Sequence, residues 1–339
     1  MQLTGPYLGI DAGGTSTQAV LIAADGSVLG YGEAGAGNHT TVGVEKARES
    51  VVRAVRAALS SAGTLPVAVA FGSAGLEQPG DPAVARRLLP DELHSCPLVF
   101  DTDALIALEG ALGGQPGIVV AAGTGAIAFG RDVHGDRAYA SGWGWRIGDE
   151  GSAHWIGSCA LNAVTKALDG RGPKTMLTEL IMDRLRIESA QGLVDWTYHP
   201  SREPSEIADL ASAADCAANA GDEVALRILE RAADELADAA QAVFERSAND
   251  WDLPVPVAYT GGVFRSQLLT RAFQQVLQAR GWGVARAPLL DPVWGAALLA
   301  WRFGRALASG AELWSVKIPE ELLEALRTGS ERQSVQTRY

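Results

Sequence analysis

The feature that most constrains this chain is a glycine turn placed directly after its first apolar segment. Tyr7–Ile10 is typical of a buried strand, and the turn Asp11-Ala12-Gly13-Gly14-Thr15 follows it. Residues 18–23 then alternate as a strand, and Asp25-Gly26 is a hairpin signal. The glycines therefore join two antiparallel strands. Rossmann and P-loop motifs pass from a strand into a helix, so both of those nucleotide folds are set aside.

This turn has the chemistry of a phosphate site. Gly13 and Gly14 let a phosphate approach bare backbone N–H groups, and Thr15 adds a hydroxyl donor. Asp11 is placed to hold Mg²⁺ directly or through water. Taken alone, the turn is explained equally well by a strained hairpin bend.

A weak internal repeat strengthens the phosphate interpretation. A second apolar strand, residues 118–121, is followed by Gly123-Thr124-Gly125, a strand over 126–131 and a hairpin at 134–136. The spacing from Thr15 to Gly26 is 11 residues, and so is the spacing from Thr124 to Gly135. The pattern predicts an α/β protein with two similar domains facing each other across a ligand cleft. We expect these domains at 1–115 and 116–310, with a C-terminal helix and polar tail at 311–339.

The second half of the chain contains a third glycine turn. Residues 154–249 are almost wholly helical in pattern, with breaks near 170–173, 198–204 and 221. A buried strand over 255–259 leads into Gly261-Gly262, and a helix follows. A flat adenosine could lie against backbone that carries no Cβ. A plain strand-to-helix turn is the alternative.

Four acidic residues follow apolar or glycine-rich segments and do not belong to runs of solvent-exposed charges: Asp101, Asp103, Asp149 and Glu150. Asp103 follows a strand over 97–100 and is well placed to accept a proton from a hydroxyl that attacks a γ-phosphate. We expect Asp101 and Thr102 to cap the following helix instead.

The run Ser141–Ser152 combines four glycines, two tryptophans and two acids. Carboxylates accept hydroxyl protons and aromatic faces cover C–H surfaces, so this composition favours a carbohydrate site. Trp143 and Trp145 can also be core residues, an alternative that we favour for Trp145. Asn38-His39 follows a glycine bend and is a candidate pair for reading sugar hydroxyls, or else a turn.

Composition excludes several classes of protein. Asp and Glu outnumber Lys and Arg by 40 to 28, so neither nucleic acid nor an anionic membrane is expected as a partner. The three cysteines lie far apart, which argues against disulfides, zinc and iron–sulfur clusters. Without a leader or a long apolar span, a cytoplasmic setting is expected.

Taken in order, these motifs resemble the N-acetylglucosamine kinases of the BadF/BadG/BcrA/BcrD ATPase family, in the sugar kinase, heat-shock and actin superfamily. The resemblance covers residues 7–301 and rests on the glycine turns, the Gly-Asn-His loop, Thr-Asp-Ala and the Trp-Gly run. It implies two ribonuclease-H-like (actin-like ATPase) domains and transfer of the ATP γ-phosphate to the 6-hydroxyl of the sugar, with Mg²⁺. Dimerisation, as a homodimer, is a family-level expectation.

The resemblance also implies residue roles. Thr15 and Thr124 would contact phosphates, Asp103 would be the base, and Gly262 would lie near the adenosine. The hexose would be surrounded by Asn38, His39, Asp103, Gly142, Trp143 and Asp149.

One departure from the family pattern affects the choice of sugar. Animal enzymes have Ser-Asn after the second turn, where this chain has Ala126-Ile127. Kinases of glucosamine, glucose or N-acetylmuramic acid therefore remain alternatives. So do a non-catalytic sugar sensor and an ATPase that serves a partner protein. The family's dehydratase activators need a cysteine-bound cluster, which these cysteines do not support.

Overall fold

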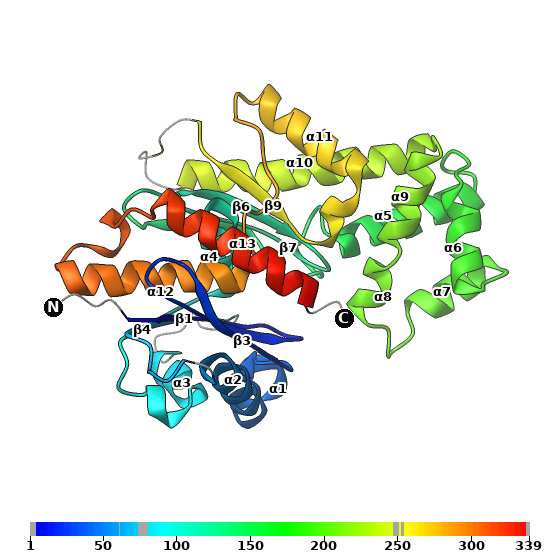
Figure 1. Ribbon diagram of the computed structural model, residues 1–339. Helices are drawn as coiled ribbons and strands as arrows, with labels where there is room; N and C mark the ends of the chain where they lie inside the picture. Colours follow the sequence, from blue (N-terminus) through cyan, green and yellow to red (C-terminus); the bar gives the residue numbers. More distant parts are fainter. Residues whose placement is uncertain (1–4, 61, 74–80, 247–250, 252–253, 337–339) are drawn as a thin grey trace. The chain divides into compact units, whose positions relative to one another are not determined.

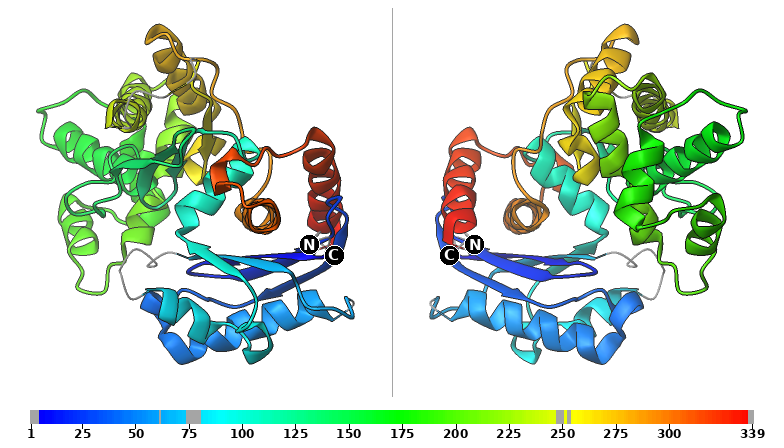
Figure 2. Two further views of the ribbon diagram at one scale, coloured as in Figure 1. Left: turned by 90° about the vertical axis from the view of Figure 1, so that its left-hand side faces the viewer. Right: turned by 90° about the vertical axis from the view of Figure 1, so that its right-hand side faces the viewer.

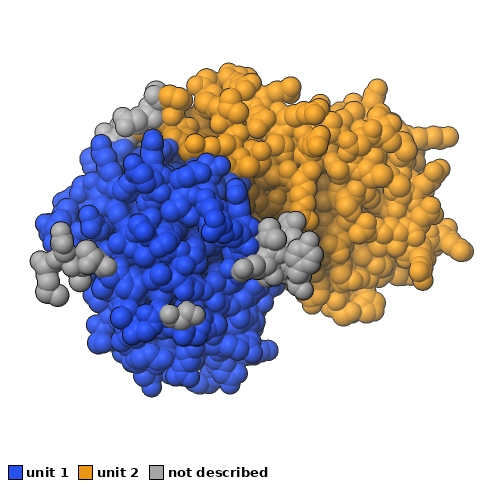
Figure 3. Space-filling view, viewed as in Figure 1, with its two compact units in different colours: residues 1–117, 133–135, 288–339 blue, residues 118–132, 136–287 orange. Residues whose placement is uncertain are grey.

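The computed structural model describes residues 5–60, 62–73, 81–246, 251 and 254–336. The chain divides into two compact units, coloured separately in Figure 3. Unit 1 comprises residues 1–117, 133–135 and 288–339, and unit 2 comprises residues 118–132 and 136–287. Each unit is built on its own sheet and is described by itself.

Unit 1 contains a five-stranded sheet in the order β3-β2-β1-β4-β5. Its strands are β1 (Tyr7–Ala12), β2 (Thr17–Ile22), β3 (Val28–Ala34), β4 (Ala68–Ser73) and β5 (Leu98–Asp101). The first three pair antiparallel, whereas β4 and β5 run parallel to β1. The carboxyl ends of β1, β4 and β5 consequently meet at one edge of the sheet, and the residues after that edge include the first glycine turn and Asp103.

Helices cover both faces of this sheet (Figures 1 and 2). In α2 the small and apolar side chains recur on one face, which packs on the sheet beside the core residues Ile10 and Phe71. The helices of unit 1 are α1 (His39–Val42), α2 (Val44–Leu59), α3 (Asp81–Leu88), α4 (Asp103–Leu112), α12 (Pro292–Ser309) and α13 (Glu320–Gln336), with 3₁₀ turns at Asp91–Leu93 and Leu313–Ser315.

Helix α12 belongs to unit 1, although we expected a second domain running to residue 310. The buried Arg302 of α12 pairs with the buried Glu109 of α4 and donates to the carbonyl of Gly114. Trp301 donates its indole N–H to the carbonyl of Ala24, 3.0 Å away. The described part of the C-terminal segment therefore packs on the first sheet. The expected C-terminal helix is present as α13.

Unit 2 contains a four-stranded sheet in the order β8-β7-β6-β9. Its strands are β6 (Gly117–Ala122), β7 (Ala126–Arg131), β8 (Arg137–Ser141) and β9 (Val257–Thr260). The sequence repeat is confirmed, because β6 has the same residue-by-residue burial as β1, and β7 the same as β2. In the described residues, an isolated parallel bridge also joins Ala258 to Arg286.

The largest buried cluster of unit 2 lies between its sheet and its helices. The long helix α10 packs on β7 and β8 and also contacts α5, α9 and α11. The helices are α5 (Ala153–Leu168), α6 (Leu177–Leu185), α7 (Ala190–Thr197), α8 (Pro204–Ala208), α9 (Ala211–Asn219), α10 (Glu223–Arg246) and α11 (Gln267–Ala279), with a 3₁₀ turn at Gly262–Arg265. In the described part of the chain, none of the helices is both long and apolar enough to cross a membrane.

Candidate functional site

The first glycine turn lies at the carboxyl edge of the unit 1 sheet. The carbonyl of Gly13 accepts hydrogen bonds from the N–H groups of Gly37 and Asn38, both at 3.0 Å. A trans peptide directs its C=O and N–H in opposite directions, so the N–H of Gly14 points away from that loop. Gly14 and Thr15 are exposed to solvent. The turn can thus offer a backbone donor and a hydroxyl to an anion.

Asn38 and His39 are held beside this turn. The side-chain oxygen of Asn38 caps α1, because it accepts from the N–H of Thr40 at 3.0 Å and from the Thr40 hydroxyl at 2.7 Å. Nδ1 of His39 is buried and has no hydrogen-bond partner in the described residues. The carboxamide oxygen of Asn38 is therefore already used, and the other groups of this pair remain for a ligand.

Three carboxylates of unit 1 come together although they are distant in sequence. Burial raises the pKa of Asp11 to about 7, and the negative charges of Asp103 and Asp291 add to the effect. Asp291 is the residue before Pro292 at the start of α12. Sequence reasoning missed Asp291, because nothing local in its segment reports its proximity to β1.

The two acids around the end of β5 have different roles. The Thr102 hydroxyl accepts from the N–H of Leu105, so the expected capping of α4 is confirmed for Thr102. Asp101 instead accepts a hydrogen bond from the N–H of Thr102 at 2.8 Å. Asp103 begins α4 and keeps contact with solvent. Protein surrounding its carboxylate removes water from it, and this desolvation raises the pKa of Asp103. Backbone N–H donors of Asp103 and Ala104 lower the pKa, but the net shift is upward. A carboxylate with a raised pKa is a stronger base.

The second glycine turn follows β6 at the equivalent edge of the unit 2 sheet, as the first turn follows β1 in unit 1. The carbonyls of Gly123 and Thr124 accept from the N–H groups of Ala153 (2.8 Å) and His154 (3.4 Å), at the start of α5. By the same peptide geometry, the N–H groups of Thr124 and Gly125 point away from α5. Both glycine turns therefore anchor their carbonyls on neighbouring backbone and direct donors the other way.

Asp149 links this turn to the tryptophan-rich loop. One of its oxygens accepts from the N–H of Gly144 at 3.2 Å. The other lies only 2.7 Å from where a Cβ on Gly125 would be, so any larger residue at 125 would displace it. Asp149 is buried and has a positive φ of 59°. It is thus held between the second glycine turn and the loop that contains Gly142 and Trp143.

The two tryptophans of this loop are not core residues. Trp143 is 68% exposed and Trp145 is 44% exposed, so the core interpretation that we favoured for Trp145 is wrong. The Trp145 ring instead lies 5.2 Å from the His154 ring and 4.8 Å from the Arg146 guanidinium. Glycine φ values of 75° at Gly142 and 86° at Gly144 turn the backbone outward, which a chain with side chains at those positions rarely does.

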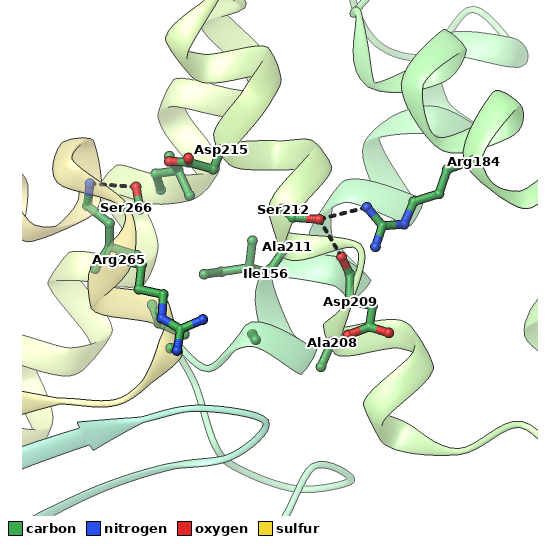
Figure 4. A pocket seen from close by; sticks show the side chains of 14 residues that line it. Ile156, Arg184, Ala208, Asp209, Ala211, Ser212, Asp215, Arg265 and Ser266 are labelled. Carbon is green, nitrogen blue, oxygen red and sulfur yellow. Dashed lines mark hydrogen bonds between the residues drawn. The ribbon is translucent and has the colours of Figure 1, made fainter. Parts of the chain in front are cut away.

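The third glycine turn borders a pocket of about 440 Å³ in unit 2 (Figure 4). A Cβ on Gly261 would lie 2.3 Å from the carbonyl oxygen of Ala122, so the backbone of this turn runs directly against the end of β6. The pocket is lined by Gly262, by apolar side chains of α5, α10 and α11, and by polar residues that the sequence analysis did not single out: Arg184, Asp209, Ser212, Asp215 and Arg265. Arg265 directly follows the segment 260–264, which contains the third glycine turn. This closeness in sequence is the signal that could have identified Arg265.

Asp11 fits a role in binding Mg²⁺. Its raised pKa comes from burial and like charges, which is the electrostatic environment that a cation relieves. Among the described residues, no group of three His, Cys, Asp or Glu side chains is arranged to hold a metal ion. Mg²⁺ usually binds one or two carboxylates, substrate phosphates and water, so it does not require such a group.

Comparison with known proteins agrees with this geometry. Residues 8–300 match the model of the BadF/BadG/BcrA/BcrD ATPase family. The chain is 30% identical over 312 residues to N-acetyl-D-glucosamine kinase of Dictyostelium discoideum, covering 87% of this chain and 97% of the relative. It is 33% identical over 241 residues to N-acetylmuramic acid/N-acetylglucosamine kinase of Clostridium acetobutylicum, covering 70% and 79%.

A solved structure shows the same fold. The crystal structure of a Chromobacterium violaceum protein assigned as an N-acetylglucosamine kinase has a TM-score of 0.66 and 31% identity, covering 88% of this chain and 99% of that one. This likeness, together with the two sheets, confirms the predicted α/β fold class. The chain belongs to the BadF/BadG/BcrA/BcrD ATPase family.

Proposed function

We propose that this chain is an ATP-dependent sugar kinase that phosphorylates the 6-hydroxyl of N-acetyl-D-glucosamine. The observation that carries the proposal is the repeated glycine turn, which in both units anchors its carbonyls and directs N–H donors outward. Relatives named as kinases of N-acetylglucosamine or of N-acetylmuramic acid and N-acetylglucosamine support it.

In each unit, the glycine turn is the element that we propose for binding the phosphates of ATP. In unit 1 the N–H of Gly14 and the hydroxyl of Thr15 offer donors, and in unit 2 the N–H groups of Thr124 and Gly125 do. The N–H groups of Gly13 and Gly123 instead close their turns, because they donate to the carbonyls of Ser16 (2.9 Å) and Gly125 (2.8 Å). Backbone donors suit an acidic chain, because they attract the nucleotide without a cluster of basic side chains.

Asp103 is the general base in this proposal. Its carboxylate accepts the proton of the sugar 6-hydroxyl as that oxygen attacks the γ-phosphorus. The new O–P bond forms while the bond from the γ-phosphorus to the bridging oxygen breaks, and ADP leaves with the electron pair. The raised pKa of Asp103 strengthens it for this task.

Asp11 holds Mg²⁺, directly or through water. The ion, when bound with ATP, neutralises charge on the phosphates. Asp11 contributes the fixed carboxylate that orients it, and its own unfavourable charge near Asp103 and Asp291 is relieved.

For the hexose we propose Asn38, His39 and Asp103 as binding residues of unit 1, and Gly142, Trp143 and Asp149 as binding residues of unit 2. The free groups of the Asn38–His39 pair and the exposed face of Trp143 support this assignment. The adenosine lies against Gly261 and Gly262 and enters the adjoining pocket, whose volume is in the range of ligand sites.

A panel of sugars tests the activity. ADP release is measured with N-acetylglucosamine, glucosamine, glucose, mannose and N-acetylmuramic acid. We expect the highest kcat/KM for N-acetylglucosamine. Sugar binding without ADP release would instead indicate a sensor, and ADP release that no sugar changes would indicate an ATPase that serves a partner.

Substitution of the base tests the mechanism. Asp103→Asn should keep ATP affinity and lower kcat by about 10²–10⁴-fold, the usual contribution of a positioned base. Asp91→Asn is the matched control, because this exposed carboxylate of unit 1 precedes β5 whereas Asp103 follows it. Equal kcat in the two variants would remove Asp103 from the mechanism.

The partner that we propose is a free sugar, with no nucleic acid or membrane involved, and the assembly is a homodimer by analogy with the family. Light scattering on the purified chain tests the assembly, and a monomeric mass would contradict it.

A further inference from the structure

The pocket described above lies directly beside the second phosphate turn. Ala153 lines the pocket, and its backbone N–H donates to the carbonyl of Gly123 in that turn. Gly262 lines it from the other side, next to Gly261, whose backbone runs against the end of β6. A nucleotide whose phosphates occupy the turn would therefore direct its nucleoside into this pocket.

The walls of the pocket suit a flat aromatic ring. Ile156, Leu229, Val263 and Leu269 are buried side chains that contribute apolar surface. A base enclosed by such surface is bound by burial of its faces, and only polar atoms at its edge can determine which base is accepted.

Asp215 is the polar group whose hydrogen bonding is incomplete. Its side chain projects from α9 into the lining of the pocket, and one carboxylate oxygen is buried with no hydrogen-bond partner in the described residues. The last torsion of an aspartate is soft, so either oxygen can be presented to a ligand. A buried carboxylate oxygen without a donor is unfavourable, and a ligand N–H would satisfy it.

None of the other polar lining side chains has a buried atom without a hydrogen-bond partner in the described residues. The Arg184 guanidinium donates to the Ser212 hydroxyl at 2.8 Å, and that hydroxyl donates to the carbonyl of Asp209 at 2.7 Å. The Ser266 hydroxyl accepts from the N–H of Leu269 at 3.2 Å. In Figure 4, Asp215 and Ser266 lie on one side of the pocket, and Arg184 and Asp209 on the other.

We propose that Asp215 selects the base of the nucleotide by accepting a hydrogen bond from the exocyclic 6-amino group of adenine. The inference rests on the proposed binding of ATP and adds the residue that makes the site specific for this base. A carboxylate accepts from an amino group but has nothing to donate, so a purine without a donor at position 6 leaves its oxygen unpaired.

Equilibrium binding of nucleotides to the full chain, with Mg²⁺ and without sugar, tests the proposal. The probes are ATP, purine riboside 5′-triphosphate, which lacks the 6-amino group, and N6,N6-dimethyl-ATP, which lacks its hydrogens. We expect the unsubstituted protein to bind ATP about 10–100-fold more tightly than purine riboside triphosphate. Dimethyl-ATP should lose at least as much affinity.

Two variants locate the effect. In Asp215→Ala the preference for ATP should fall to about 3-fold or less, while the affinity for purine riboside triphosphate, which also reports folding, stays near that of the parent. Asp209→Ala is the matched control, because this exposed acid lines the same pocket, and it should keep the preference.

The outcomes distinguish this inference from the proposed function. Equal binding of all three nucleotides by the unsubstituted protein overturns the role of Asp215 and leaves the kinase proposal intact. A preference retained in Asp215→Ala, or lost in Asp209→Ala instead, also overturns it. If no nucleotide binds, both proposals fail. The analogue comparison needs no variant, so it decides even if Asp215→Ala does not fold.

Discussion

The two glycine turns occupy equivalent places in their sheets but have different chemistry. In each unit, the strand before the turn is buried except for its second-to-last residue, which is half-buried. The strand after the turn is buried except for its second residue, which is also half-buried. In unit 1 these positions are Asp11 and Gln18, which pair directly across the strands. In unit 2 they are Ala121 and Ile127.

The supports behind the turns differ as well. The unit 1 turn is tied to the loop before α1, and the unit 2 turn is tied to the N-terminus of α5. Unit 2 therefore receives the positive end of a helix dipole, whereas unit 1 has a group of carboxylates that a cation would neutralise. The comparison teaches that two turns with the same backbone pattern can rest on different supports, a loop beside carboxylates in unit 1 and a helix N-terminus in unit 2.

The largest expected effect is on stability as a function of pH. The pKa of Asp11 is raised from 3.8 to about 7 in the folded state. The folded state therefore binds more protons than the unfolded state between these values. Its free energy of unfolding should fall as pH rises from about 4 to about 7, by up to about 4 kcal/mol from Asp11.

Urea titrations of the parent and of Asp11→Asn at several pH values, without Mg²⁺, measure this contribution. The variant should be the more stable of the two above pH 7, and the difference should vanish below pH 4. A difference that does not depend on pH would contradict the assignment.

The next effect follows from removing Asp11, the carboxylate proposed to bind Mg²⁺. Asp11→Ala gives unit 1 the residue type of unit 2 and should lower kcat/KM by at least about 10²-fold, because no fixed carboxylate orients the ion. Saturation with Mg²⁺ should require higher concentrations. Steady-state rates across a Mg²⁺ series measure both quantities, with Asp91→Ala as the control. Unchanged Mg²⁺ dependence would exclude Asp11 from metal binding.

The reverse substitution should have a smaller effect. Ala121→Asp introduces a carboxylate next to the unit 2 turn, where it repels the phosphates, and it should weaken ATP binding by about 10-fold. Ala121→Asn is the matched neutral control. Calorimetric titration with Mg·ATP compares the two, and equal affinities would show that the two turns tolerate charge alike.

The smallest effect concerns the choice of sugar. The side chain of Ile127 lies under Gly142, 3.0 Å from where a Cβ on that glycine would be. Ile127→Asn restores the residue that the animal enzymes carry and should raise the preference for N-acetylglucosamine over glucose by a few-fold. The ratio of kcat/KM values measures it, with Ile127→Val as the apolar control. An unchanged ratio would mean that this position does not read the acetamido group.

Local sequence patterns predicted most of the elements correctly. The two hairpins after the glycine turns are present, with φ values of 87° at Gly26 and 93° at Gly135, because hairpin turns depend on a few adjacent residues. The helical stretch breaks close to the expected places, but the left-handed break at Arg186 was not predicted, since a non-glycine residue gives no signal for it.

Long-range placement was not predictable in this way. The apolar pattern of α12 indicates a buried helix but not against which sheet it packs. The expected second domain, 116–310, therefore includes a helix that lies in unit 1. Trp145 was expected in the core because hydrophobicity alone does not distinguish a buried aromatic side chain from one exposed on a loop. The roles of the sugar-binding residues and of the phosphate turns stay predictions.

The sequence by itself determined the succession of strands along the chain, the three glycine turns and the position of Asp103 after β5. Each of these depends on residues that are neighbours in sequence. Only the tertiary structure placed Asp291 near Asp11 and Asp215 in the pocket beside Gly262. Those residues are brought together by helix and sheet packing across long stretches of chain. Electrostatic coupling and pocket shape depend on distance in space, on which the spacing of residues along the chain carries no direct information.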